Sequence, residues 1–357
     1  MQPIQPAIKG RGASHNPPNR FEKMHLELAT DERTDDELPP APETEYFRDS
    51  SRSIIVSNDS PDVFFDKSIN VYRGCVHGCI YCYARPYHEY LGLSAGMDFE
   101  TKIFVKEDAP RLLRSELSSA KWQPQVLAIS GVTDAYQPIE RRLQLTRRCL
   151  EVLAEFRNPV SLVTKNHLIT RDIDILAPMA AFDGVSAHIG VTSLDPELAN
   201  VMEPRASAPH ARLAAIRELS AAGVPTSVLI APVIPGLTDH EIPAILEAAR
   251  AAGACHANYT MLRLPHGIKD LFTTWLEQRF PTKKDKILGR IRDMRGGELN
   301  DPSFGSRMKG EGPIAEMIKQ VFQTNVRRLG FPGKKTLSAA SFRRPNETPA
   351  SLFDLGE

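Results

Sequence analysis

Three of the five cysteines in this 357-residue chain lie within eight residues, as Cys75, Cys79 and Cys82. The other two, Cys149 and Cys255, stand alone. An odd number of cysteines in a long chain without a secretory signal argues against a disulfide framework. Thiols clustered this tightly indicate a metal-binding loop instead, and thiolates favour zinc or an iron–sulfur cluster.

The spacing of the three cysteines, C-x₃-C-x₂-C, favours a cluster over a single zinc ion. Gly74 and Gly78 allow a tight loop in which the thiolates converge on one centre. A structural zinc site normally takes four ligands from two paired C-x₂-C knuckles, and the sequence has no second knuckle. His77 lies inside the loop, where its geometry as a fourth ligand is poor. Three cysteines on a [4Fe–4S] cluster leave one iron open for a chelating ligand.

Beyond about residue 54, short apolar runs alternate with amphipathic stretches, which predicts a βα series. Strands are expected at residues 69–72, 126–130, 160–164, 185–191, 226–230 and 259–264. Their nearly continuous apolar character is typical of parallel strands buried on both faces. Six units are fewer than the eight of a closed barrel, so a partial barrel and an open doubly wound sheet both fit this pattern.

Three regions are expected along the chain. Residues 1–52 are rich in Pro, Asp and Glu and predict a flexible polar leader. Within this leader, residues 10–12 and 16–21 are candidates for a binding arm. Residues 53–270 form the α/β core. Residues 271–357 predict a helical extension, with helices at 272–280, 283–294 and 314–329.

Charge is balanced overall but unevenly distributed. Residues 266–345 carry seventeen Lys and Arg against eight Asp and Glu. Such a basic region suits the phosphates of a nucleic acid, and the alternative is a solvated face on helices that cap the core. No apolar run approaches the roughly 20 residues that span a bilayer. We therefore expect a cytoplasmic protein that does not enter the membrane.

The cysteine loop, with Tyr81 before its last cysteine and a βα series after it, resembles the signature of the radical S-adenosylmethionine (radical SAM) superfamily. The resemblance covers about residues 65–265. It implies a partial (β/α)₆ barrel of the TIM type with Cys75, Cys79 and Cys82 on a [4Fe–4S] cluster. It also implies that S-adenosylmethionine chelates the open iron. A reduced flavodoxin or ferredoxin would then deliver the electron that releases a 5′-deoxyadenosyl radical.

Within that superfamily, the sequence is most similar to the branch around spore photoproduct lyase. The similarity assigns the carboxylate of S-adenosylmethionine to Lys165 after the third strand, and its ribose or carboxylate to Ser193 after the fourth. It assigns the adenine to Tyr81. It assigns the amino group of the ligand to a stretch after the second strand, formed by Ser130, Gly131 and Thr133.

The sequence departs from that branch at one position. Spore photoproduct lyase keeps a hydrogen-donating cysteine just after its second strand, whereas residues 129–137 here contain none. Tyr136 is the candidate for a radical role in this stretch, and packing is the alternative for it. The expected activity is therefore a lyase- or transferase-type radical SAM reaction on an unidentified substrate, with nucleic acid the favoured class.

Two other kinds of protein remain open from the residues alone. One is an iron–sulfur electron carrier or sensor that does not cleave S-adenosylmethionine. The other is a zinc-stabilised nucleic-acid-binding protein. Residues suited to contact a ligand stand at successive strand ends, namely Gly131, Lys165 and Ser193. They favour the enzyme, because an electron carrier needs no organised ligand pocket.

Overall fold

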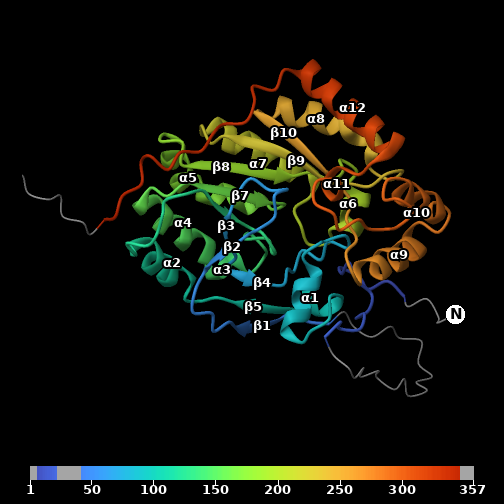
Figure 1. Ribbon diagram of the computed structural model, residues 1–357, viewed down its shortest axis with the longest axis horizontal. Helices are drawn as coiled ribbons and strands as arrows, with labels where there is room; N and C mark the ends of the chain where they lie inside the picture. The colour runs from blue at the N-terminus through green and yellow to red at the C-terminus, as the bar shows by residue number, and fades with distance from the viewer. Residues whose placement is uncertain (1–5, 22–41, 346–357) are drawn as a thin grey trace, which may run out of the picture.

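The computed structural model of the protein describes residues 6–21 and 42–345. Its centre is a seven-stranded sheet in the order β10-β9-β8-β7-β6-β3-β2 (Figure 1). Six of these strands run parallel, and β2 is antiparallel to β3. The strands are β2 (Ile55–Ser57), β3 (Lys67–Ile69), β6 (Leu127–Ile129), β7 (Val160–Thr164), β8 (Val185–Gly190), β9 (Thr226–Val233) and β10 (His256–Met261). Because β10 and β2 are edge strands, the sheet is not closed, and it forms the partial barrel that the resemblance implies.

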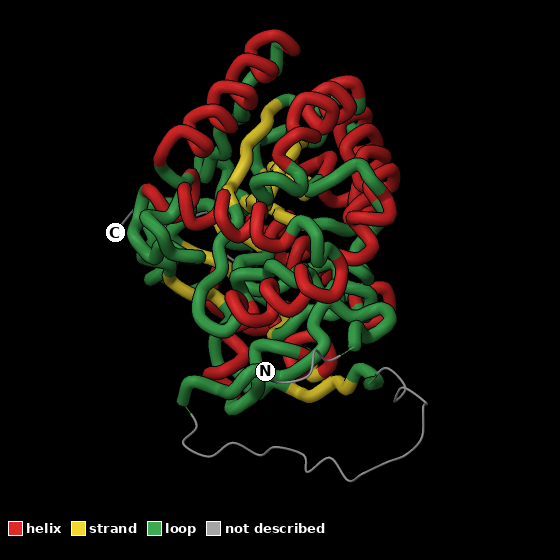
Figure 2. The backbone as a smooth tube through the Cα atoms, turned by 90° about the vertical axis from the view of Figure 1, so that its right-hand side faces the viewer, coloured by secondary structure: helices red, strands yellow, loops and turns green. Residues whose placement is uncertain are grey.

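Helices cover the outer face of the sheet, and consecutive helices contact one another or the strands beneath them. In Figure 2 the strands lie among these helices. The covering helices are α2 (Ala109–Ser118), α3 (Glu140–Leu143), α4 (Leu145–Phe156), α5 (Ile173–Ala180), α7 (Pro209–Ala221), α8 (Ile242–Ala251) and α12 (Gly312–Leu329). Shorter helices at strand ends are η2 (His167–Asp172), α6 (Pro196–Met202) and η3 (Asp239–Glu241). The C-terminal extension adds α9 (Ile268–Arg279), α10 (Lys284–Asp293) and α11 (Ser306–Lys309). The helices expected at residues 272–280, 283–294 and 314–329 correspond to α9, α10 and α12, whereas the sequence does not predict α11.

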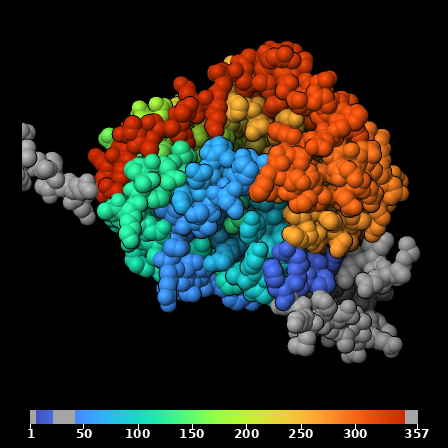
Figure 3. Space-filling model, viewed as in Figure 1, coloured from blue at the N-terminus to red at the C-terminus, as the bar shows by residue number. Residues whose placement is uncertain are grey.

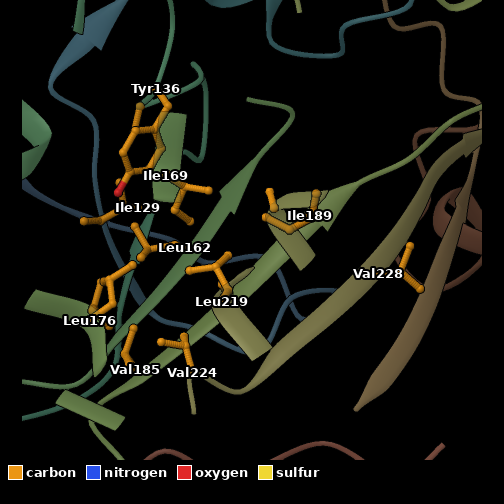
Figure 4. Packing of buried hydrophobic residues seen from close by; sticks show 14 of the residues in the cluster. Ile129, Tyr136, Leu162, Ile169, Leu176, Val185, Ile189, Leu219, Val224 and Val228 are labelled. Atoms are coloured by element: carbon orange, nitrogen blue, oxygen red, sulfur yellow. The ribbon is translucent and has the colours of Figure 1, made fainter. Parts of the chain in front are cut away.

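The two faces of the sheet differ in chemistry, because side chains alternate along each strand. Ile129 and Leu162 occupy one register level and pack against the helices in the main apolar core (Figure 4). The adjacent level pairs Ser68 with Ala128, Ser161 and Ser186 across four strands. The concave face of the barrel is therefore lined at this level by small and polar side chains, whereas barrel interiors are usually filled by branched apolar residues.

The first predicted strand is divided in two. The structure has β3 at Lys67–Ile69 in the main sheet and β4 (Tyr72–Arg73) in a second sheet of order β1-β5-β4, with β1 at Glu45–Arg48 and β5 at Lys102–Val105. The break falls at Asn70, whose side-chain oxygen accepts hydrogen bonds from the backbone N–H groups of Gly131 (2.9 Å) and Val132 (3.0 Å). This contact turns the chain away from the barrel, toward the cysteine loop.

Residues 6–21 differ from the flexible leader that the sequence predicted. They pack against the segment that follows the cysteines, which contains η1 (Arg85–Leu91) and α1 (Met97–Thr101). Figure 3 shows this arm in dark blue against its neighbours. The backbone N–H groups of Gly12 and Ala13 donate to the carboxylate of Glu100 at 3.0 and 2.8 Å. The arm is ordered because a buried carboxylate takes its amides, a long-range contact that local composition does not encode.

A second contact spans the open side of the barrel. The loop between β2 and β3 reaches the segment before and within α11, which lies beside β10. Asp62 accepts a hydrogen bond from the Gly305 N–H at 2.7 Å and forms an ion pair with Arg307, which also donates to Ser60. The Asp62 side chain is only 7% exposed. The gap between the two edges of the sheet is thus bridged at the level of this loop.

The fit of Gly12 against the cysteine loop yields a stability prediction. A Cβ atom at Gly12 would lie 1.8 Å from the carbonyl oxygen of Gly78, a backbone atom that cannot move away cheaply. We expect Gly12→Ala to release the arm and to lower the free energy of unfolding by about 1–3 kcal/mol, as overpacking does. Thermal unfolding and limited proteolysis of the arm measure this effect.

Gly289→Ala is the matched control, because Gly289 lies within α10 and has open space around its Cα. Alanine is favoured over glycine inside a helix by roughly 0.5–1 kcal/mol. The control is therefore expected to unfold at the wild-type temperature or slightly above it. Equal effects of the two substitutions would contradict the tight fit at Gly12.

Candidate active site

The three clustered cysteines follow β4 and lie close together in the structure. Cys75 and Cys79 are buried, and Cys82 is partly exposed. Burial raises the pKa of the Cys75 thiol, and charge on Cys79 or Cys82 raises it further. Cys82 packs in one apolar cluster with Cys75 and in another with Cys79, so the three side chains lie near one another. Among the residues that the structure describes, no group of three or more His, Cys, Asp or Glu side chains is arranged to hold a single metal ion.

A buried ion pair holds the backbone of the cysteine loop. Arg85 and Glu100 are both 0% exposed, with 2.5 Å between guanidinium nitrogen and carboxylate oxygen. Arg85 also donates to the carbonyl oxygens of Cys79 (3.0 Å) and Gly78 (3.2 Å). Neither Arg85 nor Glu100 was singled out in the sequence, because an arginine and a glutamate fifteen residues apart carry no local signal of a pair.

The segment after β6, predicted to contact S-adenosylmethionine, is hydrogen-bonded to the same loop. The Thr133 hydroxyl donates to the carbonyl oxygen of Gly74 at 2.7 Å. The Gln137 side chain, fully buried, accepts from the Val76 N–H at 3.0 Å. Ser130 adopts a positive φ of 81°, and its hydroxyl accepts from the Ala135 N–H. In this structure the Thr133 and Gln137 side chains brace the cysteine loop, and the Ser130 hydroxyl bonds within its own segment. The backbone of residues 130–131 directly follows β6.

His77, considered above as a fourth ligand, is engaged on both sides of its ring. Its Nδ1 lies 3.4 Å from Asp134, and its Nε2 lies 3.2 Å from the Asn166 amide. Asp134 also accepts hydrogen bonds from the Thr164 hydroxyl (2.7 Å) and the Lys165 N–H (2.9 Å). His77 therefore ties the cysteine loop to the carboxyl ends of β6 and β7.

Lys165 points across the end of the sheet toward the cysteines. Its Nζ donates to the carbonyl oxygen of Ala231 at 3.1 Å and lies 5.8 Å from the centre of the Tyr81 ring. Its side chain fills the space where a Cβ of Gly190 would stand. Burial lowers the pKa of Lys165, whereas nearby thiolates at Cys79 and Cys82 would raise it. The charge of Lys165 in turn lowers the pKa of the Cys79 and Cys82 thiols, which burial raises.

Tyr81 is anchored by a buried network that the sequence did not reveal. Its hydroxyl contacts the Glu203 carboxylate and the Thr192 hydroxyl. Glu203, 2% exposed, pairs with Arg212, which donates to the carbonyl oxygens of Gly190 (3.1 Å) and Ser207 (2.6 Å). The network fixes the Tyr81 ring beneath the Lys165 ammonium.

Ser193 is committed to a neighbouring carboxylate. Its hydroxyl donates to Glu241 at 2.7 Å and accepts from the Asp195 N–H at 3.0 Å. Asp195 is the residue that caps α6, since its side chain accepts from the N–H groups of Glu197 and Leu198. Ser193 is 1% exposed, so a role toward a ligand requires its hydroxyl to exchange partners.

The remaining candidates lie away from this cluster. Tyr136 is fully buried on the helix-covered side of the sheet, among Ile129, Leu162 and Ile169 (Figure 4), which favours the packing interpretation. Cys149 is buried in α4, and the Cys255 thiol lies 3.2 Å from the carbonyl oxygen of Thr226 near the start of β10.

Comparisons with known proteins place the chain in a family. The family model of the radical SAM superfamily matches residues 69–249. An uncharacterized protein of Mycobacterium tuberculosis is 36% identical over 248 residues, which cover 69% of this chain and 72% of that protein. The chain belongs to the radical SAM superfamily. An uncharacterized protein of Methanocaldococcus jannaschii is 30% identical over 173 residues, 48% of this chain and 62% of that protein.

The fold is similar to that of spore photoproduct lyase. The structure of that enzyme complexed with dinucleoside spore photoproduct matches with a TM-score of 0.59 and 16% sequence identity, over 80% of each chain. None of the described helices is both long and apolar enough to cross a membrane.

The residues of this radical SAM protein fit the group that the superfamily binds. The three cysteine side chains lie near one another, their loop is held by buried hydrogen bonds, and the Lys165 ammonium lies 5.8 Å from the centre of the ring of Tyr81 in that loop. Soft thiolate donors of this kind suit an iron–sulfur cluster.

Replacing Glu203 tests how much the hydrogen-bond network around the Tyr81 hydroxyl contributes to the free energy of unfolding. Glu203→Ala leaves the Arg212 guanidinium buried without a counter-charge, and we expect a loss of about 3–5 kcal/mol in the free energy of unfolding. Glu155→Ala is the matched control, because Glu155 pairs with Arg114 at the surface, where both side chains are more than a third exposed. That pair should cost less than about 1 kcal/mol. Chemical denaturation measures both, and similar losses would contradict the role given to Glu203.

The carboxylate at Asp134 predicts a pH dependence of stability. Burial raises its pKa, but His77 and the hydrogen bonds from Lys165 and Thr164 outweigh burial and lower the pKa to about 2. A depressed pKa in the folded state stabilises the fold above the unfolded value near 3.9. The stabilisation, about 2 kcal/mol, is lost as pH falls from about 4 toward 2. We expect Asp134→Asn to destabilise the protein at pH 7 and to flatten this acid limb, as urea titrations at several pH values would show.

Proposed function

We propose that this protein cleaves S-adenosylmethionine reductively and uses the resulting radical to abstract hydrogen from a substrate. Cys75, Cys79 and Cys82 would hold a [4Fe–4S] cluster. When bound, the cluster supplies the electron that converts S-adenosylmethionine to methionine and a 5′-deoxyadenosyl radical. The observation that carries the proposal is the position of Lys165, an ammonium anchored at a strand end and 5.8 Å from the centre of the ring of Tyr81 in the cysteine loop.

The side chains around this site have separate tasks in the proposal. Lys165 retains donors beyond its bond to Ala231, so its ammonium is free to bind the carboxylate of S-adenosylmethionine. Tyr81 presents its ring next to that ammonium and would contact the adenine. The backbone of Ser130 and Gly131 would receive the amino group of the ligand. Thr133 and Ser193 would contribute only by giving up the bonds they make to Gly74 and Glu241.

The proposed substrate is a nucleic acid, and the proposed reductant is a flavodoxin or a ferredoxin. The basic residues of the C-terminal helices support the first assignment, because phosphate contacts by Lys and Arg supply most of nonspecific nucleic-acid affinity. The fold shared with spore photoproduct lyase, whose complex contains a dinucleoside photoproduct, supports the same class. Since residues 129–137 hold no cysteine, the reaction differs from that enzyme in its hydrogen donor, and either a lyase- or a transferase-type outcome fits.

The test is anaerobic turnover with S-adenosylmethionine alone. After reconstitution with iron and sulfide and reduction by dithionite, mass spectrometry should detect 5′-deoxyadenosine. We expect Cys79→Ala to lose the cluster absorbance and this product. Cys255→Ala is the matched control and should retain both, because Cys255 lies near the start of β10. A full cluster without cleavage would favour an electron carrier instead, and bound zinc in protein isolated anaerobically would exclude the enzyme.

Lys165→Ala separates the ligand site from the cluster. Loss of a charge-assisted hydrogen bond to a carboxylate costs about 1.5–3 kcal/mol, so we expect S-adenosylmethionine affinity to fall by roughly ten- to hundredfold. The iron content and cluster absorbance should be unchanged. The measurement is the equilibrium affinity of the reconstituted variant for S-adenosylmethionine. An affinity equal to that of the wild type would show that Lys165 does not bind this ligand.

A further inference from the structure

Four exposed aromatic side chains gather beside the cysteine loop. Tyr83 directly follows Cys82, Tyr87 and Tyr90 lie on η1, and Phe21 lies on the N-terminal arm. Phe21 is 56% exposed, Tyr83 45%, Tyr87 53% and Tyr90 69%. The ring centroids of Phe21 and Tyr90 lie 5.0 Å apart, and those of Tyr87 and Tyr90 lie 6.4 Å apart. Tyr83 lies two residues before η1, the helix that carries Tyr87 and Tyr90. We call these four residues the aromatic surface.

The aromatic surface borders the open side of the barrel. Tyr83 directly follows Cys82, and its hydroxyl donates to the carbonyl oxygen of Gly131, beyond the end of β6. The guanidinium of Arg263, beyond the end of β10, lies 5.6 Å from the centre of the Tyr83 ring. Residues that follow strands on both sides of the gap therefore meet at Tyr83, next to the proposed cluster.

Positive charge flanks the aromatic surface at both ends. Arg263 forms no ion pair with any residue that the structure describes, and its guanidinium donates to the sulfur of Met308 at 3.6 Å. Arg20 lies 5.1 Å from the centre of the Phe21 ring. The neighbouring carboxylates are withdrawn, since Glu89 is 1% exposed and paired with Arg20, and Asp62 is paired with Arg307. A negatively charged partner that binds here would therefore contact arginines and aromatic rings. Neither of the two carboxylates named above is exposed to repel it.

We infer that the aromatic surface binds a single-stranded stretch of nucleic acid, with unpaired bases stacked on Tyr87 and Tyr90 and a phosphate on Arg263. Aromatic rings beside basic residues are how proteins hold single strands without reading their sequence, because every base has a π-face. The inference rests on the proposed function, which supplies the reactive site that this surface borders. It adds that the bases next to the reaction are unpaired.

An acidic electron donor is the competing occupant, because the surface lies near the cluster and is positively charged. Stacking distinguishes the two. A protein donor needs the charge of Arg263 but no planar base on Tyr87 or Tyr90, whereas a nucleic-acid strand loses affinity when either ring is removed.

The experiment measures fluorescence anisotropy of a labelled single-stranded oligonucleotide of about twelve nucleotides on the reconstituted full-length protein. We expect Tyr87→Ala and Tyr90→Ala each to weaken binding by roughly tenfold. Arg263→Gln should reduce the slope of log affinity against log salt by about one. An abasic strand of the same length should bind Tyr87→Ala and wild type equally. Circular dichroism and iron content verify that the variants are folded and loaded.

Matched controls lie elsewhere on the surface. Tyr46, 40% exposed on β1, provides Tyr46→Ala, and Arg111, on α2, provides Arg111→Gln. Both should bind the oligonucleotide as the wild type does.

Three results would overturn the inference. The first is wild-type affinity in the two tyrosine variants, and the second is an equal loss of affinity for the abasic strand. The third is unchanged oligonucleotide binding together with weakened binding of reduced flavodoxin, which would assign the surface to the electron donor. Binding is measured without S-adenosylmethionine or reductant, so a failure of the cleavage reaction would refute the proposed function and leave this result readable.

Discussion

The geometry of the cysteine loop depends on one buried ion pair, Arg85 with Glu100. A guanidinium has five N–H donors, and burial is costly unless they are satisfied. Here all five have acceptors, namely Glu100 and the carbonyl oxygens of Gly78, Cys79, Ala95 and Gly96. The carboxylate is equally occupied, because Gly12 and Ala13 donate their backbone N–H groups to it. The ion pair, the cysteine loop and the N-terminal arm thus form one hydrogen-bonded unit. The amides of the arm replace hydrogen bonds to water that the Glu100 carboxylate lost on burial.

The pair also explains why the loop needs no regular secondary structure. Backbone carbonyls that face a buried site must find donors within the protein, and the cysteine loop has neither a helix nor a sheet to supply them. Arg85 supplies them from one side, and the residues after β6 supply them from the other, through Thr133 and Gln137. Thiols held in this way would lose little freedom on binding the proposed cluster, since the loop is already ordered by its own hydrogen bonds.

Much of the fold could be predicted from the sequence, because parallel strands buried on both faces leave continuous apolar runs. The predicted strand 160–164 coincides with β7, and the six-unit partial barrel is confirmed. The arm at residues 6–21 could not be predicted, because its order comes from Glu100, about ninety positions away. The break between α3 and α4 at Gln144, with φ 51°, has a similar origin. Buried Glu140 accepts from the Thr146 N–H and begins α4 anew.

The same distinction separates the predicted site residues. Motif spacing identifies side chains that must lie at strand ends, and Lys165 and Tyr81 do lie beside the thiols. Spacing does not identify the hydrogen-bond partners of these side chains. It therefore reveals neither Glu241, which accepts from Ser193, nor Glu203, which accepts from Tyr81. A hydroxyl that already donates to a carboxylate can bind a ligand only if the new hydrogen bond is as favourable as the one it breaks. An ammonium has three donors, so it can bind a ligand without breaking an existing hydrogen bond. By this criterion Lys165 is the strongest of the predicted ligand contacts, and Thr133 and Ser193 act first on the protein itself.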